Sequence, residues 1–324
     1  MNYYVKAFLA LFVVLTLMAC GKNNTPSTNE PTDHSSEEPI PPEQFPDQFL
    51  SSNFEKLYNQ TSESLQEMVS LKQLETLGND FIKDVESFEL VSEMPINNLT
   101  EYQWLSDGGD KGIRAHFDDE GIIHALLLVP ITSASDSDEN YTENTYQMPM
   151  TGEWFTFWGG TNELVNYHYS LEVQRYAYDL LIVQDRKTFE GDPADNESYY
   201  AFGESVVAPA DGIVISVENN IPDNTPTVDT NTGQPLGNHV IIKHENNEYS
   251  VIAHLQEGSL EVSQGDNVTA GDVLGKVGNS GNSSEPHIHF HVADGPDWEE
   301  ATSIRIKLES GEEPIRGDKV TGYE

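Results

Sequence analysis

Cysteine and basic residues are scarce in this 324-residue chain. Cys20 is the only cysteine, so no intramolecular disulfide can form and oxidation cannot stabilise the fold. Lysine and arginine number 16 against 55 aspartate and glutamate residues, which gives a formal net charge of −39. Binding to nucleic-acid phosphates or to anionic lipid requires clustered lysine and arginine. The composition therefore argues against a nucleic-acid partner, and we interpret the acidic excess as a solubilising surface.

The apolar run at the N-terminus is short. Lys6 precedes an apolar stretch from Ala7 to Leu17, and the box Leu17-Met-Ala-Cys20 follows it. The stretch is too short for a comfortable transmembrane helix and polar sequence comes next, as in a secretory signal peptide. An L-x-A-C box in this place resembles bacterial lipoproteins, in which the cysteine is lipidated and becomes the mature N-terminus. The alternative is an ordinary secretory signal with a leftover thiol.

We therefore expect residues 1–20 to be a lipoprotein signal with Cys20 as its lipidation site. Acyl chains insert with about 0.8 kcal/mol per buried CH₂, so they would hold the protein on the extracellular face of a bacterial cell membrane. Residues 21–44 are rich in proline, serine, threonine and glutamate without periodicity, which predicts a disordered tether.

Residues 45–132 combine helix-like segments with strand-like ones. Apolar residues recur at helical spacing in 45–57 and 64–77, and Ser64-Leu-Gln-Glu67 fits a capping box at the start of the second helix. Four strand-like runs follow, at residues 87–91, 102–105, 112–117 and 122–129. The layout predicts a small α+β domain and resembles, in pattern only, the nuclear-transport-factor-like class.

A polar linker over 133–147 separates this domain from the rest of the chain. Short strand-like runs broken by glycine, proline, asparagine and aspartate then predict an all-β, antiparallel-sheet domain over 148–324. The runs are a strand, turn and strand over 206–217, a hairpin of 238–244 with 248–255, and a strand pair over 268–277. Two polar insertions, 185–200 and 218–237, predict long loops of the kind that wall a cleft.

Three histidines alternate with apolar residues in His287-Ile288-His289-Phe290-His291-Val292. Side chains on a β-strand alternate between two faces, so the imidazoles should share one face while the apolar residues point into a core. Three imidazoles in a row on a half-buried strand suit a metal site better than a packing surface. The sequence therefore predicts that the chemistry lies here.

Four short blocks of the β domain are together more specific than any single motif. They are Ala208-Pro-Ala-Asp-Gly212, Val251-Ile-Ala-His-Leu255, Val268 to Gly275, and Gly278-Asn-Ser-Gly-Asn-Ser-Ser-Glu-Pro-His-Ile-His-Phe290. Their succession resembles the lysostaphin-type (LytM-like) zinc endopeptidases of bacterial cell walls. The resemblance implies a metallopeptidase fold, a Zn²⁺ cofactor and a peptidoglycan peptide as substrate.

The resemblance also implies roles for individual residues. In the family's H-x-H motif the second histidine binds zinc and the first acts in catalysis, so His289 is the expected ligand and His287 a catalytic residue. His254 matches the second catalytic histidine, and Asp179 matches the acidic zinc ligand. His291 lies one step beyond the motif, and we interpret it as a support for the ligands or as structural.

One block departs from the family pattern. The usual first signature is H-x-x-x-D, but Arg175 stands four residues before Asp179, and a permanent guanidinium cation cannot ligate Zn²⁺. In one interpretation the metal is lost and the domain is an inactive relative. In the other, His168 supplies the missing imidazole from a hairpin over 170–174 that sets it opposite Asp179. We favour His168 because the other expected ligands and catalytic residues are all present.

Two imidazoles and one carboxylate would hold zinc and leave a coordination position for water. Zinc lowers the pKa of such a water to about 7 and polarises the scissile carbonyl. His254 and His287 would then orient or deprotonate the water, or stabilise the oxyanion. The expected function is a lipid-anchored zinc endopeptidase of peptidoglycan. The alternative is a metal-free relative that binds the cell wall or activates another hydrolase.

Overall fold

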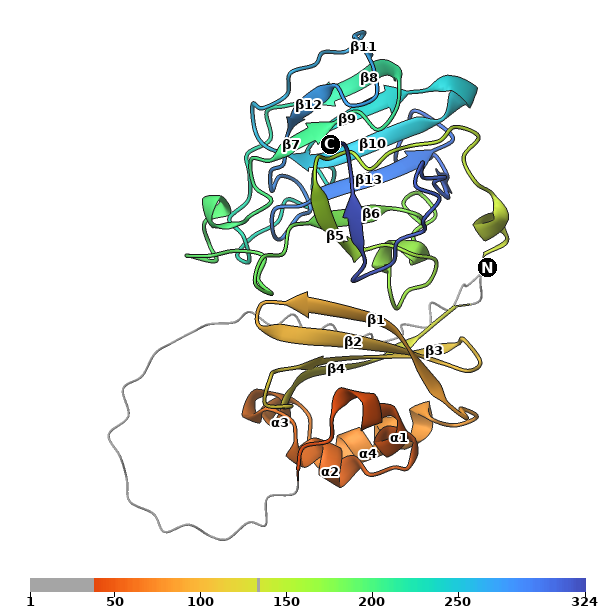
Figure 1. Cartoon of the computed structure of the whole chain (residues 1–324), viewed down its shortest axis with the longest axis vertical. Helices are drawn as coiled ribbons and strands as arrows, with labels where there is room; N and C mark the ends of the chain where they lie inside the picture. The colour runs from red at the N-terminus through yellow and green to blue at the C-terminus, as the bar shows by residue number, and fades with distance from the viewer. Residues whose placement is uncertain (1–37, 133–134) are drawn as a thin grey trace, which may run out of the picture. The chain divides into compact units, whose positions relative to one another are not determined.

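Four short α-helices, preceded by a 3-10 helix (Pro42–Gln44) and followed by a four-stranded meander, make up the first part of the fold. The computed structural model describes residues 38–132 and 135–324 (Figure 1). The helices are α1 (Phe45–Leu50), α2 (Phe54–Asn59), α3 (Glu63–Met68) and α4 (Leu71–Phe81). The strands are β1 (Phe88–Ile96), β2 (Leu99–Ser106), β3 (Lys111–Phe117) and β4 (Ile123–Pro130), in one antiparallel sheet of that order. The predicted α+β class is confirmed, whereas the nuclear-transport-factor-like assignment stays a prediction.

Both expected helices of this part are divided in the structure. The first becomes α1 and α2, because Ser52 lies between them with a φ of 57°, in the left-handed region that ends a helix. The second becomes α3 and α4. The capping box is Ser70 with Gln73, and the predicted box of Ser64 with Glu67 is wrong. Ser70 N–H donates to the Gln73 side chain at 3.0 Å, while Ser70 Oγ accepts from Gln73 N–H, so α4 starts on its own cap.

Apolar side chains join these helices to one face of the sheet. The buried cluster includes Phe45, Phe49, Phe54 and Leu57 from the helices and Trp104, Ile113, Phe117 and Ile123 from the strands. Burying each such side chain stabilises the fold by about 1.5–3 kcal/mol. The alternating residues Glu101 and Gln103 of β2 are polar, yet they are also buried. Both faces of this small sheet are therefore covered, one by apolar side chains and the other by polar contacts.

The second part of the fold is built from short antiparallel strands. They are β5 (Glu153–Trp158), β6 (Tyr178–Leu181), β7 (Ser205–Val207), β8 (Gly212–Glu218), β9 (Asn238–Lys243), β10 (Tyr249–Leu255), β11 (Asn267–Val268), β12 (Val273–Lys276), β13 (Ile288–Ala293), β14 (Ser303–Ile304) and β15 (Lys319–Thr321). The main sheet has the order β11-β8-β9-β10-β13-β6-β5-β15, with β14 paired to β13. A two-stranded sheet joins β12 to β7. The predicted all-β antiparallel class of this part is confirmed.

One of the two strand pairings expected in the β part forms, and the other does not. The hairpin of β9 with β10 forms as expected. The strand pair expected over 268–277 does not pair with itself, because β11 joins β8 while β12 joins β7. Strands β11 and β12, although adjacent in the sequence, thus belong to two different sheets.

The β13 strand carries part of the histidine row through the core. Ile288, Phe290 and Val292 are fully buried in the main apolar cluster, as the alternation predicts. His289 and His291 lie on the other face of β13, and they are buried too. His287 comes just before the strand. The candidate site is therefore built on a central strand of the main sheet.

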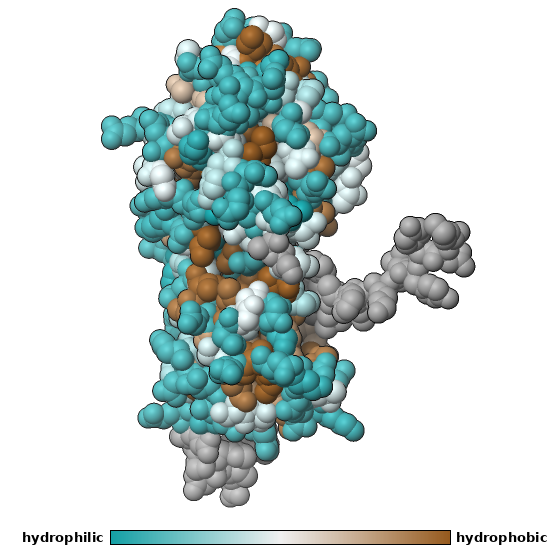
Figure 2. Space-filling view, turned by 90° about the vertical axis from the view of Figure 1, so that its right-hand side faces the viewer, coloured by the Kyte–Doolittle hydropathy of each residue, from teal (hydrophilic) through white to brown (hydrophobic). Residues whose placement is uncertain are grey.

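The segment predicted as a linker partly packs on the β domain. Thr142 and Tyr146 are buried, and their backbone N–H groups donate to the carbonyls of Arg305 and Lys307 at 2.9 Å. At the other end of the described chain, Ile40 is buried ahead of α1, so the last residues of the predicted tether also join the fold. Hydrophilic side chains cover most of the face shown in Figure 2, with apolar ones gathered near its middle.

The predicted signal peptide and Cys20 lie outside the described residues. Among the helices of residues 38–132 and 135–324, none is long and apolar enough to cross a membrane.

Candidate metal and catalytic site

Strand pairing sets two of the candidate ligands side by side. Asp179 lies on β6 and His289 on β13, and the antiparallel register places them directly opposite each other. Side chains of residues paired in this way share a face of the sheet. Nδ1 of His289 lies 2.9 Å from Oδ1 of Asp179, and both side chains are almost fully buried. The carboxylate and the imidazole implied by the family resemblance are thus adjacent in space.

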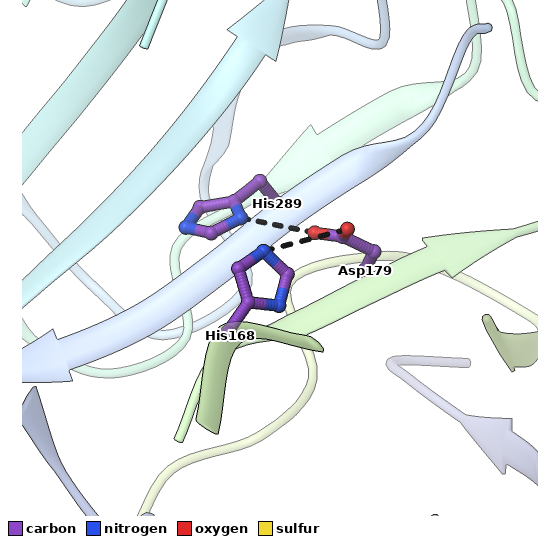
Figure 3. A group of neighbouring side chains, drawn as sticks. All are labelled: His168, Asp179 and His289. Atoms are coloured by element: carbon purple, nitrogen blue, oxygen red, sulfur yellow. Dashed lines mark hydrogen bonds and ion pairs between the residues drawn. The ribbon is translucent and has the colours of Figure 1, made fainter. Parts of the chain in front are cut away.

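His168 reaches the same point by a route that differs from the prediction. It lies in a 3-10 helix, Tyr167–Ser170, and the predicted hairpin is wrong because β5 and β13 occupy both edges of β6. Even so, Nε2 of His168 lies 3.6 Å from Oδ2 of Asp179 (Figure 3). Ligand atoms of His168, Asp179 and His289 all lie within 4.8 Å of one another. The three proposed ligands therefore form one cluster.

Asn166 fixes the orientation of His168. Its amide donates to the carbonyls of Gly160, Arg175 and Ala177, which leaves Oδ1 as an acceptor. This oxygen accepts from the backbone N–H of His168 at 3.1 Å and lies 2.9 Å from Nδ1 of the ring. Nδ1 therefore carries the proton, and Nε2 keeps its lone pair facing the carboxylate. Nε2 is buried and has no hydrogen-bond partner among the described residues, which fits a metal ligand.

His291 supports the other imidazole of the cluster. It is fully buried, and its Nδ1 lies 2.9 Å from Nε2 of His289. When Nδ1 of His289 faces the carboxylate and a metal, its Nε2 carries the proton and donates to His291. Ligating histidines are commonly oriented in this way by a partner on their second nitrogen. Of the two interpretations left open by the sequence, the contact favours support of the ligand.

Two further imidazoles border the three candidate ligands. Nδ1 of His287 lies 2.8 Å from the carbonyl oxygen of Glu285, and its Nε2 lies 3.7 Å from Oδ1 of Asp179. Nδ1 of His254 lies 2.9 Å from the carbonyl oxygen of Ser280, and the rings of His254 and His287 are 4.8 Å apart. A carbonyl oxygen only accepts, so both rings carry their proton on Nδ1. Nε2 is then the nitrogen of each ring that is available for proton transfer.

The backbone at His254 is strained. Its φ is 64°, a left-handed value that is uncommon outside glycine. It lies where the pairing of β10 with β9 shifts register, between Ile252 and Leu255. Such irregularities re-aim a side chain and occur next to active sites. Here the irregular conformation accompanies the close approach of the His254 and His287 rings.

Burial favours the neutral form of three imidazoles, His168, His254 and His291, while the carboxyl of Asp179 stays ionised. It lowers the pKa of His168 to about 3, and it holds the pKa of His254 and His291 well below the usual value. Burial alone would raise the pKa of Asp179, but the imidazoles around it, His168 first, lower that pKa below its ordinary value. Two imidazole nitrogens with one carboxylate are a donor set that catalytic zinc takes.

Metal-free protein should lose stability as the pH falls from 6.5 towards about 3, the unfolded and folded pKa values of His168. Between these pH values the imidazole is protonated in the unfolded chain but stays neutral in the folded one. The free energy of unfolding therefore decreases as the pH decreases. The loss is on the order of 1 kcal/mol per pH unit for each such histidine. Urea unfolding of chelator-treated protein between pH 7 and 4 measures it. A stability that does not change over this range would contradict the assignment.

Arg175 and the buried His244 lie outside the cluster. The guanidinium of Arg175 stacks on the ring of Tyr169, with 5.1 Å from Cζ to the ring centroid. His244 is buried, with its Nδ1 2.7 Å from the carbonyl oxygen of Asp211, and it packs edge-on against Tyr146. Both residues serve packing, and the departure at Arg175 does not occupy the candidate metal position.

Comparison with known proteins gives one family match and several likenesses to solved structures. Residues 198–300 match the model of Peptidase family M23. The catalytic domain of lysostaphin from Staphylococcus simulans is 17% identical, with 53% of this chain and 93% of that chain covered and a TM-score of 0.27. A putative peptidase M23 from Pseudomonas aeruginosa is 15% identical, with 69% and 82% covered and a TM-score of 0.30. A chain of a SpoIIQ–SpoIIIAH pore-forming complex is 19% identical, with 50% of this chain and 89% of that chain covered and a TM-score of 0.29.

Identities and TM-scores this low carry no argument about what the chain does. The family match is the specific finding, and it includes His254, His287 and His289. It begins after Asp179 and His168, so the geometry alone connects these two residues with the matched segment. Residues 198–300 of this chain form a domain of Peptidase family M23, as the resemblance of the sequence blocks implies.

Proposed function

We propose that this protein is a zinc-dependent endopeptidase that hydrolyses peptide bonds of bacterial peptidoglycan. The observation that supports this most is the orientation of His168, whose free and buried Nε2 faces Asp179 beside His289. A bound cation would pair with the buried Nε2 of His168 and with the buried carboxylate of Asp179. The M23 domain over 198–300 supports the peptidase class.

The residues around the cluster have separate parts in this proposal. His168, Asp179 and His289 would hold Zn²⁺, which when bound activates water and polarises a carbonyl. His254 and His287 present their Nε2 atoms beside the cluster, so either ring can take the proton of the attacking water. The protonated ring can then hydrogen-bond the developing oxyanion or protonate the leaving amine.

A metal-free wall-binding or hydrolase-activating module is the alternative. Arg175 favours it, because the family's first histidine is absent from that position. The orphaned Nε2 of His168 favours the zinc enzyme instead, since a domain that had lost its metal has no need of this orientation.

Zinc content and wall digestion of the whole protein test the proposed function. We expect one zinc per chain after reconstitution, and release of peptide fragments from purified peptidoglycan. His289→Ala removes a ligand and should abolish both. Sub-stoichiometric zinc in the wild type, together with digestion that His289→Ala does not affect, would refute the hydrolase.

We also propose a lipid anchor at Cys20 on the extracellular face of the membrane, on the sequence pattern alone. Mass spectrometry of the protein from a bacterial membrane decides this point. A mature chain that starts at Cys20 with an acyl mass increment supports the anchor, and an unmodified cysteine rejects it.

A further inference from the structure

A buried ion cluster joins the polar face of the N-terminal sheet to the β domain. Glu101 of β2 is 1% exposed, and Arg316 is 3% exposed. Nε of Arg316 donates to Oε1 of Glu101 at 2.5 Å, and Nη2 donates to Oε2 at 3.1 Å. Ser92 Oγ also donates to the carbonyl oxygen of Arg316, at 2.6 Å. Two parallel bonds between a guanidinium and a carboxylate fix geometry strongly, and loss of one partner leaves an unpaired buried charge.

Arg114 of β3 extends this cluster to the segment that precedes His168. Its Nη2 donates to the carbonyl oxygen of Leu164, and its Nε lies 3.7 Å from Oε1 of Glu101. Gly112 permits close packing at the same place, because a Cβ there would lie 2.7 Å from Cδ1 of Leu164. The side chain of Leu164 thus packs on the backbone of β3, and its carbonyl oxygen accepts from the guanidinium of Arg114.

A line of rings continues from the cluster to the candidate ligand. The guanidinium carbons of Arg114 and Arg316 lie 4.7 and 4.1 Å from the ring centroid of Trp158. Trp158 and Tyr167 pack edge to face, with ring centroids 5.3 Å apart. The rings of Tyr167 and His168 are 3.9 Å apart. Arg114 of the N-terminal sheet therefore contacts the segment directly at Leu164, and it is linked to the His168 end through Trp158 and Tyr167.

Charge holds the cluster together. Burial alone would raise the pKa of Glu101, but Arg316 and Arg114 hold that pKa well below its ordinary value. The carboxylate therefore stays ionised and keeps both guanidiniums in place over the Trp158 ring.

We propose that the β2–β3 face of the N-terminal sheet positions His168 in the candidate zinc site, with Arg114 as the positioning residue. This inference rests on the proposed function, because it concerns a proposed zinc ligand. A histidine at the position of Arg175 would share its chain segment with Asp179 and need little further support. His168 comes from a separate segment, and the N-terminal sheet supplies the contacts that hold that segment. The N-terminal sheet then helps to position a ligand of the candidate zinc site.

Arg114→Ala in the whole chain tests this proposal by two measurements. We expect the zinc dissociation constant to rise roughly 10–100-fold, as for loss of a partner that orients a ligand. In metal-free protein, the amides of Leu164, Val165 and His168 should exchange hydrogen faster, since their bonds to Asn162 and Asn166 depend on the segment staying ordered. Arg114→Lys keeps a cationic donor, so it should restore part of both effects.

Leu57→Ala is the matched control, because Leu57 is buried in the N-terminal core away from the ion cluster. It should lower the melting temperature without changing zinc affinity or exchange in the 164–168 segment. Unchanged zinc affinity and exchange in Arg114→Ala would overturn the proposal, and so would equal losses in Leu57→Ala. If the wild type binds no zinc, the proposed function fails separately. Hydrogen exchange of the amides in residues 164–168 then tests the positioning role by itself. Faster exchange in Arg114→Ala supports that role, and unchanged exchange overturns it.

Discussion

Replacement of His168 by alanine should abolish tight zinc binding. The ring presents a deprotonated, buried Nε2 to Asp179, and Asn166 holds it in that tautomer. The variant leaves two protein ligands, one fewer than catalytic zinc sites use. Its dissociation constant should therefore rise by more than the roughly 10–100-fold that loss of an outer partner costs. Competition with a chromophoric chelator measures the constant.

Arg175→Ala provides the control for this experiment, since the guanidinium packs on Tyr169 and does not enter the cluster. It should bind zinc with wild-type affinity. If His168→Ala also kept wild-type affinity, the assignment of the third ligand would be wrong, while Asp179 and His289 could still belong to a site.

Replacement of His287 by alanine should remove activity and leave zinc in place. The ring borders the cluster, with its Nε2 3.7 Å from Asp179 and its Nδ1 held by the carbonyl of Glu285. A general acid or base contributes about 10²–10⁴-fold to a rate, so kcat for peptidoglycan cleavage should fall by this factor. Zinc affinity should change only a few-fold, because the residue is not a proposed ligand.

His239→Ala is a suitable control for His287, because its Nδ1 bonds to the carbonyl of Gly237 and it takes no part in the proposed chemistry. It should digest peptidoglycan at the wild-type rate. A His287→Ala enzyme that retained full activity would contradict the catalytic role. A variant that lost its zinc together with its activity would instead make His287 a ligand.

Periodicity predicted the class of both parts of the fold but not the breaks within their elements. Alternation in His287 to Val292 predicts the buried apolar face of β13 correctly. The break at Ser52 and the separate pairing of β11 and β12 depend on how the chain packs as a whole, which local patterns do not record. Short helices and short strands are the elements for which tertiary packing most often decides the boundaries.

The residues of the candidate site were also predicted better than the elements that position them. The family resemblance implies Asp179, His254, His287 and His289, which the structure brings together. His168 also joins them, but through a 3-10 helix and not through the expected hairpin. The missed signal is Asn166, since an asparagine two residues before a histidine can bond that residue's backbone and begin a turn. The support from Glu101 and Arg114 has no local signal, because these residues are far away in the chain.

The location of the metal in zinc-loaded crystals tests directly whether His168, Asp179 and His289 bind zinc. Anomalous diffraction at the zinc absorption edge identifies the ion without any assumption about activity. We expect one strong peak bonded to Nε2 of His168, Nδ1 of His289 and a carboxylate oxygen of Asp179, with Zn–N distances of about 2.0–2.1 Å. A peak bonded to other residues, or no peak in crystals soaked with zinc, would contradict it.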